Sequence, residues 1–306
     1  MRKTILVLVT MAVIGGPVPA GAIGQDSQSP PAGDFEGLVD VGGYRLFLRC
    51  IGEGSPTVIL DAASGATSQT WNQIQPELAT FTRVCSYDRA GLGRSDPRPP
   101  TFGTVTNTTM VEELRTLLNN AGIEGPLVLV GHSLGGLNMQ LFARLYPKDV
   151  VGVVLVDATP VDLLDRFAEV LTEGQLRAVF PGPERHPERY DIRAALAEME
   201  DAPRFPNVPL IVLGRTVFPP DVPGFPDEEL NRLWTEMQVA QGQLSSRSEV
   251  IFVEGAGHFI HRDRPDVVVE SIRRLVEAAH RPGKGCGDTN HAHERKAECK
   301  TRLKAA

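Results

Sequence analysis

A serine between two glycines carries the clearest chemical signal in this chain. Ser133 is the middle residue of Gly-His-Ser-Leu-Gly, after an apolar run at 127–130 and before leucines at helical spacing that stop at Pro147. This spacing predicts a strand, a sharp turn and a helix, with the serine on the turn. A Cβ at either flanking glycine would clash with the neighbouring strand or helix, so the pattern indicates a nucleophilic serine on a strained backbone.

A serine hydroxyl needs a base to become a nucleophile, and the base needs an orienting acid. His258 lies in VEGAGHFIH, between the last expected strand and the last expected helix, where Gly255 and Gly257 allow a tight loop. We therefore expect His258 to be the base. His261 lies beyond this turn, and we expect it on the surface or at a helix start. His132 points off the serine turn and is expected to pack or to form a hydrogen bond.

Two aspartates compete for the role of the acid, which should lie between the serine and the base in the sequence. Asp157 ends the strand VGVVLVD, which places it one strand away from the serine at the same edge of the sheet. Asp221 follows the next strand, but RTVFPP separates it from the end of that strand. We favour Asp157, because strand ends fix orientation better than loops do, and keep Asp221 as the alternative.

An oxyanion hole requires two backbone N–H groups that point to where negative charge develops. The first is expected from Leu134, the residue after the nucleophile. The second is expected from the loop DAASGATSQTW, with Ser64 as the preferred donor and Ala63 as the next.

The remaining pattern predicts the elements that position these residues. A hairpin at 38–41 and 44–50 comes first, and alternating strands and helices follow. Strands are expected at 57–60, 83–87, 127–130, 151–156, 210–213 and 250–253, and helices at 71–79, 108–121, 134–145, 227–243 and 265–279. We expect an α/β fold with a mostly parallel eight-stranded sheet flanked by helices. An insert at about 160–208, with helix-like patches at 161–171 and 192–199, would form a helical cap over the serine.

The two ends of the chain differ in composition from the body. Residues 1–22 have two cations before an apolar stretch and a small-residue cleavage site, which predicts a signal peptide and export to the cell envelope or the medium. Residues 23–35 are expected to be a flexible leader, 36–282 the folded domain and 283–306 a basic tail. The apolar stretch is too short for an ordinary membrane span, so none is expected.

Four cysteines fit an oxidising compartment. Cys50 and Cys85 fall in or at the end of expected strands, whereas Cys286 and Cys299 share the tail, so we expect the disulfides Cys50–Cys85 and Cys286–Cys299. The alternative for the first pair is two buried thiols.

Composition limits the possible partners. The chain has 306 residues, 42% of them hydrophobic, which suffices for one large core. A formal net charge of −7 argues against nucleic acid as a partner. The residues call for no metal and no organic cofactor, and they do not indicate an oligomeric state.

Taken together, GHSLGG, YDRAGLGRSD, VDATP and GAGHF followed by RPDVVVESI resemble the α/β-hydrolase superfamily, most closely its secreted actinobacterial members with a single cap insert. The resemblance covers 36–281 and implies a Ser/His/acid triad with Ser133 as nucleophile and His258 as base. Two departures stand out. Ala62-Ala63 replaces the His-Gly that commonly follows the third strand, and Val217 occupies a position where many relatives carry the acid.

We expect a secreted serine hydrolase that cleaves small carboxylic esters through an acyl-enzyme. A peptidase or amidase, a lactonase and a carbon–carbon bond hydrolase would use the same triad. A binding protein without turnover is the alternative from a different class. Related enzymes that open epoxides or remove halide use an aspartate nucleophile, and Ser133 argues against both.

Overall fold

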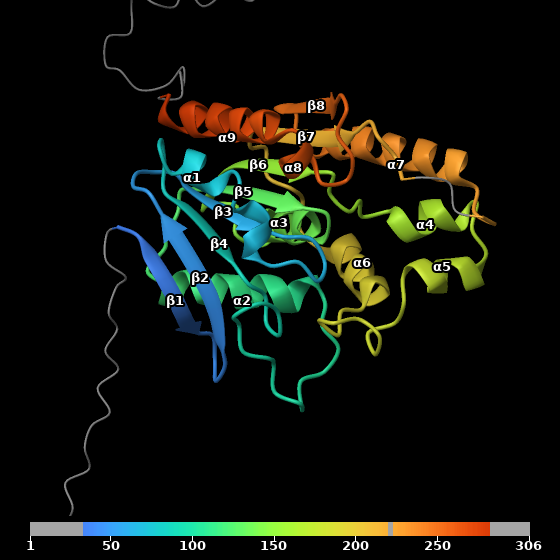
Figure 1. Cartoon of the computed structure of the whole chain (residues 1–306), viewed down its shortest axis with the longest axis horizontal. Coiled ribbons are helices and arrows are strands. Elements are labelled where there is room, and N and C mark those ends of the chain that lie inside the picture. The colour runs from blue at the N-terminus through green and yellow to red at the C-terminus, as the bar shows by residue number, and fades with distance from the viewer. Residues whose placement is uncertain (1–32, 220–222, 282–306) are drawn as a thin grey trace, which may run out of the picture.

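The computed structural model of the chain describes residues 33–219 and 223–281. Helices lie on both faces of an eight-stranded sheet with the order β1-β2-β4-β3-β5-β6-β7-β8 (Figure 1). The pairs β1–β2 and β2–β4 are antiparallel, and the other neighbours are parallel. The expected fold class is therefore confirmed. The predicted signal peptide, the cysteine pair of the tail and Asp221 lie outside the described residues.

The strands agree with the sequence pattern to within a few residues. They are β1 (Phe35–Asp40), β2 (Arg45–Ile51), β3 (Thr57–Asp61), β4 (Val84–Tyr87), β5 (Leu127–His132), β6 (Val150–Val156), β7 (Leu210–Arg215) and β8 (Ser248–Val253). The main helices are α2 (Asn107–Asn120), α3 (Leu134–Leu145), α7 (Asp227–Gln241) and α9 (Pro265–His280).

The helix expected at 71–79 is wrong in extent. The structure has two short pieces there, the 3-10 helix η1 (Ser68–Trp71) and α1 (Gln75–Leu78). Pro76 falls in the first turn of α1. Proline has no N–H to donate and its ring clashes with the preceding turn, so one continuous helix could not pass through this position.

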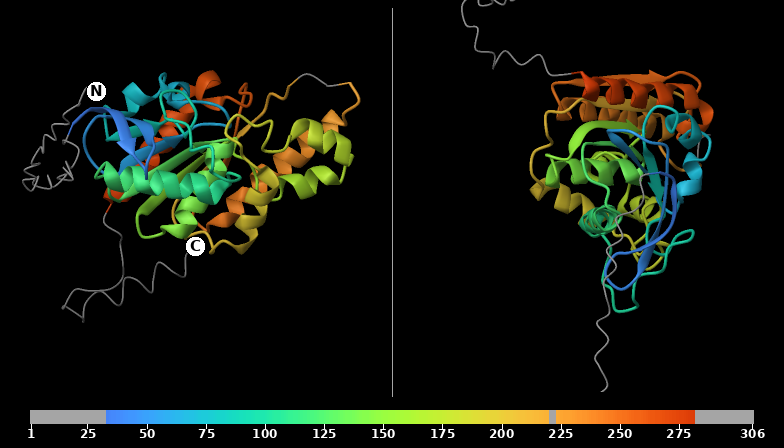
Figure 2. Two further views of the ribbon diagram at one scale, coloured as in Figure 1. Left: turned by 90° about the horizontal axis from the view of Figure 1, so that it is seen from below. Right: turned by 90° about the vertical axis from the view of Figure 1, so that its left-hand side faces the viewer.

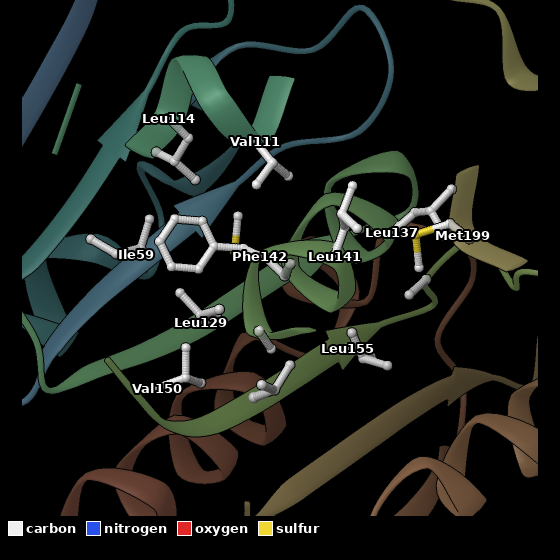
Figure 3. Packing of buried hydrophobic residues seen from close by; sticks show 14 of the residues in the cluster. Ile59, Val111, Leu114, Leu129, Leu137, Leu141, Phe142, Val150, Leu155 and Met199 are labelled. Carbon is white, nitrogen blue, oxygen red and sulfur yellow. The ribbon is translucent and has the colours of Figure 1, made fainter. Parts of the chain in front are cut away.

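The core consists of two layers, one on each face of the sheet. Along β5, Leu127 and Leu129 face the layer covered by α2, α3 and α7, whereas Val128 and Val130 face α1, α8 (Ile260–Asp263) and α9. The edge-on view of Figure 2 shows the sheet between these layers. Phe142 of α3 is completely buried and packs between the sheet and α2 (Figure 3). Burial of such a side chain contributes about 1.5–3 kcal/mol to stability.

Three helices lie between β6 and β7, namely α4 (Leu163–Ala168), α5 (Glu173–Val179) and α6 (Ile192–Asp201). The sequence pattern indicated the first and third but missed α5. A local signal for it existed, because Thr172 and Gln175 form a capping box at its start. Met199 of α6 joins the core beside Leu137 of α3 (Figure 3), and α4 packs on α7. The segment is thus attached to the sheet domain at more than one point.

The disulfide between Cys50 and Cys85 is confirmed, with an S–S distance of 2.09 Å. The two residues are direct partners in the antiparallel register of β2 and β4. No helix in the described ranges combines the length and the apolar character needed to span a bilayer.

Candidate active site

Ser133 occupies a strained turn between β5 and α3. Its backbone angles are φ 54° and ψ −120°, a region that residues with a side chain rarely adopt. A Cβ on Gly131 would lie 2.3 Å from the Gly135 carbonyl oxygen, and one on Gly135 would lie 2.4 Å from the Asp61 carbonyl oxygen. Both glycines are therefore required by close packing. The Ser133 N–H donates to the Val156 carbonyl oxygen at 3.2 Å, which ties the turn to β6.

Asp157 and His258 come together at the carboxyl ends of the strands. The His258 Nδ1 lies 2.6 Å from Asp157 Oδ2, and the carboxylate is completely buried. Asp157 Oδ1 accepts from Trp234 Nε1 at 2.9 Å and from the Arg215 backbone N–H at 3.3 Å. The His258 Nδ1–H therefore donates to the carboxylate, which leaves Nε2 able to accept a proton. Asp157, which the sequence favoured, is in contact with His258, and Asp221 lies outside the described residues.

A cavity of about 400 Å³ opens beside these groups. Ser133, Leu134, His258 and Ser64 all line it. Within the described part of the chain, the Ser133 hydroxyl forms no hydrogen bond with a protein group, so it is available to a bound molecule. Most of the remaining lining is apolar: Leu163, Phe167, Val179, Phe180, Pro181, Ile192 and Trp234.

Two further histidines lie behind His258. The His132 Nε2–H donates to the His258 carbonyl oxygen at 2.8 Å, as expected for a supporting residue. His261 lies in the first turn of α8, so the expected helix start is confirmed, but the expected surface position is wrong, because His261 is only 1% exposed and lies within hydrogen-bond distance of Thr70 Oγ1 at 2.9 Å. Burial lowers the pKa of His132 well below its usual value and lowers the pKa of His261 to about 3. Both rings are therefore neutral at pH 7 and place no positive charge beside His258.

The loop after β3 contacts the segment between α5 and α6. Ser64 Oγ lies 2.5 Å from His186 Nε2, and the Gly65 N–H donates to Glu188 Oε2 at 2.8 Å. Leu134 is the first residue of α3, so its N–H has no partner within the helix. Ser64 and Leu134 line the same cavity as Ser133, and their role as oxyanion donors stays a prediction.

A buried ion pair network holds this loop. Arg89, just after β4, lies 2.6 Å from both Asp61 and Glu188, and all three residues are at most 2% exposed. Arg89 Nη2 also donates to the Ala63 carbonyl oxygen at 2.6 Å. Burial alone would lower the pKa of Arg89, but the two carboxylates raise it well above its usual value. Burial alone would raise the pKa of Glu188, but Arg89 lowers it. Arg89 and Glu188 are therefore both ionised.

Sequence reasoning assigned no role to Arg89, His186 or Glu188. Arg89 belongs to the quoted motif YDRAGLGRSD, which was a signal of the fold only. Glu188 lies 99 residues from Arg89 in the sequence, and no local sequence pattern around either residue predicts the pair. Within the described ranges, no group of three or more His, Cys, Asp or Glu side chains is placed to hold a metal ion.

The sheet order, the serine turn and the histidine loop after the last strand define an α/β-hydrolase fold. Residues 58–271 match the model of the Alpha/beta hydrolase family, and the chain belongs to this family.

The similar proteins found by comparison are distant in sequence. The chain is 26% identical over 300 residues to "Probable transporter efuK" of Hormonema carpetanum. This match covers 79% of the chain but only 43% of that protein. It is 25% identical over 222 residues to "Uncharacterized protein YqjL" of Bacillus subtilis, covering 71% of the chain and 82% of that protein. Among solved structures, a thermophilic esterase from Thermogutta terrifontis has a TM-score of 0.57 at 23% identity, covering 80% of this chain and 99% of that one.

Proposed function

We propose that this chain is a secreted serine hydrolase that cleaves carboxylic esters through an acyl-enzyme. One observation carries the proposal: the 2.6 Å contact between His258 Nδ1 and Asp157 Oδ2, beside a cavity that Ser133 also lines. A buried carboxylate, an imidazole and a free hydroxyl on a strained turn are the components of a serine triad. The disulfide between β2 and β4 supports export, because disulfides persist in oxidising compartments.

Acylation begins when Ser133 Oγ attacks the carbonyl carbon of the ester and His258 Nε2 takes the hydroxyl proton. The carbonyl oxygen becomes an oxyanion, which accepts hydrogen bonds from the N–H groups of Leu134 and Ser64. The bond from the carbonyl carbon to the alcohol oxygen then breaks. His258 gives its proton to that oxygen, and the alcohol leaves.

Deacylation reverses these roles. His258 takes a proton from a water molecule, whose oxygen attacks the acyl carbon. The bond to Ser133 Oγ breaks, the serine regains its proton from His258, and the carboxylic acid leaves. Asp157 remains ionised throughout and stabilises the imidazolium. Because His132 and His261 are neutral, neither adds a positive charge that would oppose this imidazolium.

The test compares wild type with Ser133→Ala on short-chain and long-chain p-nitrophenyl esters, with a fluorophosphonate as covalent probe. Ser246→Ala is the matched control, because Ser246 is exposed and lies outside the cavity lining. We expect a loss of at least about 10⁴-fold in kcat for Ser133→Ala, no change for the control, and labelling only where Ser133 is present. Wild type that neither hydrolyses an ester nor reacts with the probe would overturn the proposal in favour of a binding protein.

A further inference from the structure

Arg215 is the one ionised side chain on the described wall of the cavity, since the lining contains no carboxylate and no other Lys or Arg. It is the last residue of β7, and its side chain is 14% exposed. The surrounding wall is mainly apolar. The cavity therefore presents a bound molecule with a single positive charge.

The hydrogen-bond donors of this guanidinium are mostly unused. Arg215 Nη1 lies 3.5 Å from Asp157 Oδ2, which is too long for a strong hydrogen bond. Arg215 Nε is buried and has no partner, and no group in the described ranges accepts a hydrogen bond from either Nη atom. Unlike Nε, neither Nη atom is fully buried, so both are accessible to a bound molecule. Several donors are thus left free beside the cavity.

Asp157 is the counter-ion of Arg215 at 3.5 Å, but both of its oxygens already accept hydrogen bonds from other donors. Oδ2 accepts from His258, and Oδ1 accepts from Trp234. Burial lowers the pKa of Arg215, although Asp157 acts in the opposite direction. A second carboxylate in the cavity would complete its coordination.

The guanidinium is also held in a fixed orientation. Its Cζ lies 4.6 Å from the Trp234 ring centroid and 5.0 Å from the Phe218 ring centroid. Aromatic contacts of this kind restrict an arginine that would otherwise be mobile, and little entropy is then lost when it binds an anion. A planar guanidinium with free donors matches the geometry of a carboxylate.

We propose that Arg215 binds a free carboxylate of the substrate, so that the preferred substrates are esters that carry a second, ionised carboxyl group, such as half-esters of dicarboxylic acids. The inference rests on the proposed ester hydrolysis. The apolar wall formed by Leu163, Phe167 and Phe180 would hold the carbon chain between the ester and the carboxylate. Arg215 is then a specificity residue, and it takes no part in the covalent steps.

The experiment compares mono-p-nitrophenyl adipate with p-nitrophenyl hexanoate, which have acyl chains of the same length but differ in charge. We expect wild type to prefer the anionic ester by about 10-fold or more in kcat/KM. Arg215→Met is expected to lower kcat/KM for the anionic ester by about 10–100-fold, mostly through KM, and to change the neutral ester by less than about threefold. Arg185→Met, at an exposed arginine outside the lining, is the matched control and should leave both esters unchanged.

Three results would overturn the inference: no preference in wild type, an equal loss on both esters in Arg215→Met, or a loss confined to the neutral ester. An equal loss would mean that Arg215 acts through Asp157 instead of on the substrate. If Arg215→Met does not fold, competitive inhibition of wild type decides, because adipate should inhibit more strongly than adipamide, and equal inhibition would contradict the inference. Hydrolysis of neither ester by wild type would count against the proposed function itself.

Discussion

The two halves of the site are held by different parts of the molecule. Ser133, Asp157 and His258, the acid–base half, follow β5, β6 and β8 and meet at one edge of the sheet. The loop at 62–67, the oxyanion loop, also follows a strand, but it is held by hydrogen bonds to Glu188 and Arg89. The first half depends on the sheet, and the second depends on the segment between β6 and β7.

This difference indicates how each half responds to change. The buried strands β5 and β6 fix Ser133 and Asp157, so a substitution in the acid–base half should act on the chemistry directly. The oxyanion loop depends on one ion pair network, in which Glu188 both neutralises Arg89 and accepts from the Gly65 N–H. Movement of the segment that carries Glu188 should therefore change the placement of the Ser64 N–H.

The largest effect should follow from Asp157→Asn, in the acid–base half. An amide in place of the carboxylate no longer fixes the His258 tautomer or stabilises the imidazolium, so kcat should fall by about 10⁴-fold with little change in KM. Asp221→Asn is the matched control and should change kcat by less than about threefold. Steady-state kinetics on one p-nitrophenyl ester measure both variants. A severe loss in Asp221→Asn and a mild one in Asp157→Asn would reassign the acid.

Glu188→Gln should have an intermediate effect through the oxyanion loop. Gln keeps the shape but removes the charge opposite Arg89, and we expect kcat to fall by about 10–100-fold while KM changes by less than about threefold. Glu184→Gln, at an exposed position of the same loop, is the control.

Affinity for a boronic acid that mimics the tetrahedral intermediate gives a second measurement on Glu188→Gln. This affinity should fall in parallel with kcat, because the same N–H groups contact the oxyanion. A variant with reduced thermal stability but unchanged kcat and boronate affinity would show that Glu188 has only a structural role.

The smallest effect is on the pH dependence of stability, which His132 and His261 behind His258 determine in part. The unfolded chain binds protons on His132 and His261 below pH of about 6.5, whereas the folded chain keeps both rings neutral to much lower pH. The stability that these two neutral rings contribute is therefore complete above pH of about 6.5 and is lost as the pH falls toward 3.

His261→Gln removes one of these two groups. Between pH 7.5 and 5, the variant should lose about 2 kcal/mol less unfolding free energy than wild type does. Urea unfolding at the two pH values measures this difference, and His280→Gln, at an exposed histidine, is the control. An equal pH dependence in wild type and His261→Gln would contradict the neutral, buried assignment.

The sequence predicted the parts of the molecule that local patterns determine. Alternating strands and helices, the strained serine turn and the Cys50–Cys85 pair each have signals within a few residues of the feature. Asp157 could be favoured because the end of a strand has a defined direction. The catalytic roles of these residues stay predictions.

The contacts that the sequence could not predict are long-range. The Arg89–Glu188 pair spans 99 residues, and the Ser64–His186 contact spans 122. Each depends on how the segment between β6 and β7 folds back onto the sheet. The burial of His261 was missed for the same reason, because its neighbours Thr70 and Trp71 come from a distant part of the chain.

The acyl-enzyme is the central claim, and mass spectrometry of the protein quenched soon after mixing with p-nitrophenyl acetate tests it most directly. We predict that wild type gains the mass of one acetyl group, that peptide mapping places this group on Ser133, and that Asp157→Asn accumulates it more slowly. Turnover without any covalent acetyl adduct, or an adduct on another residue, would contradict the account.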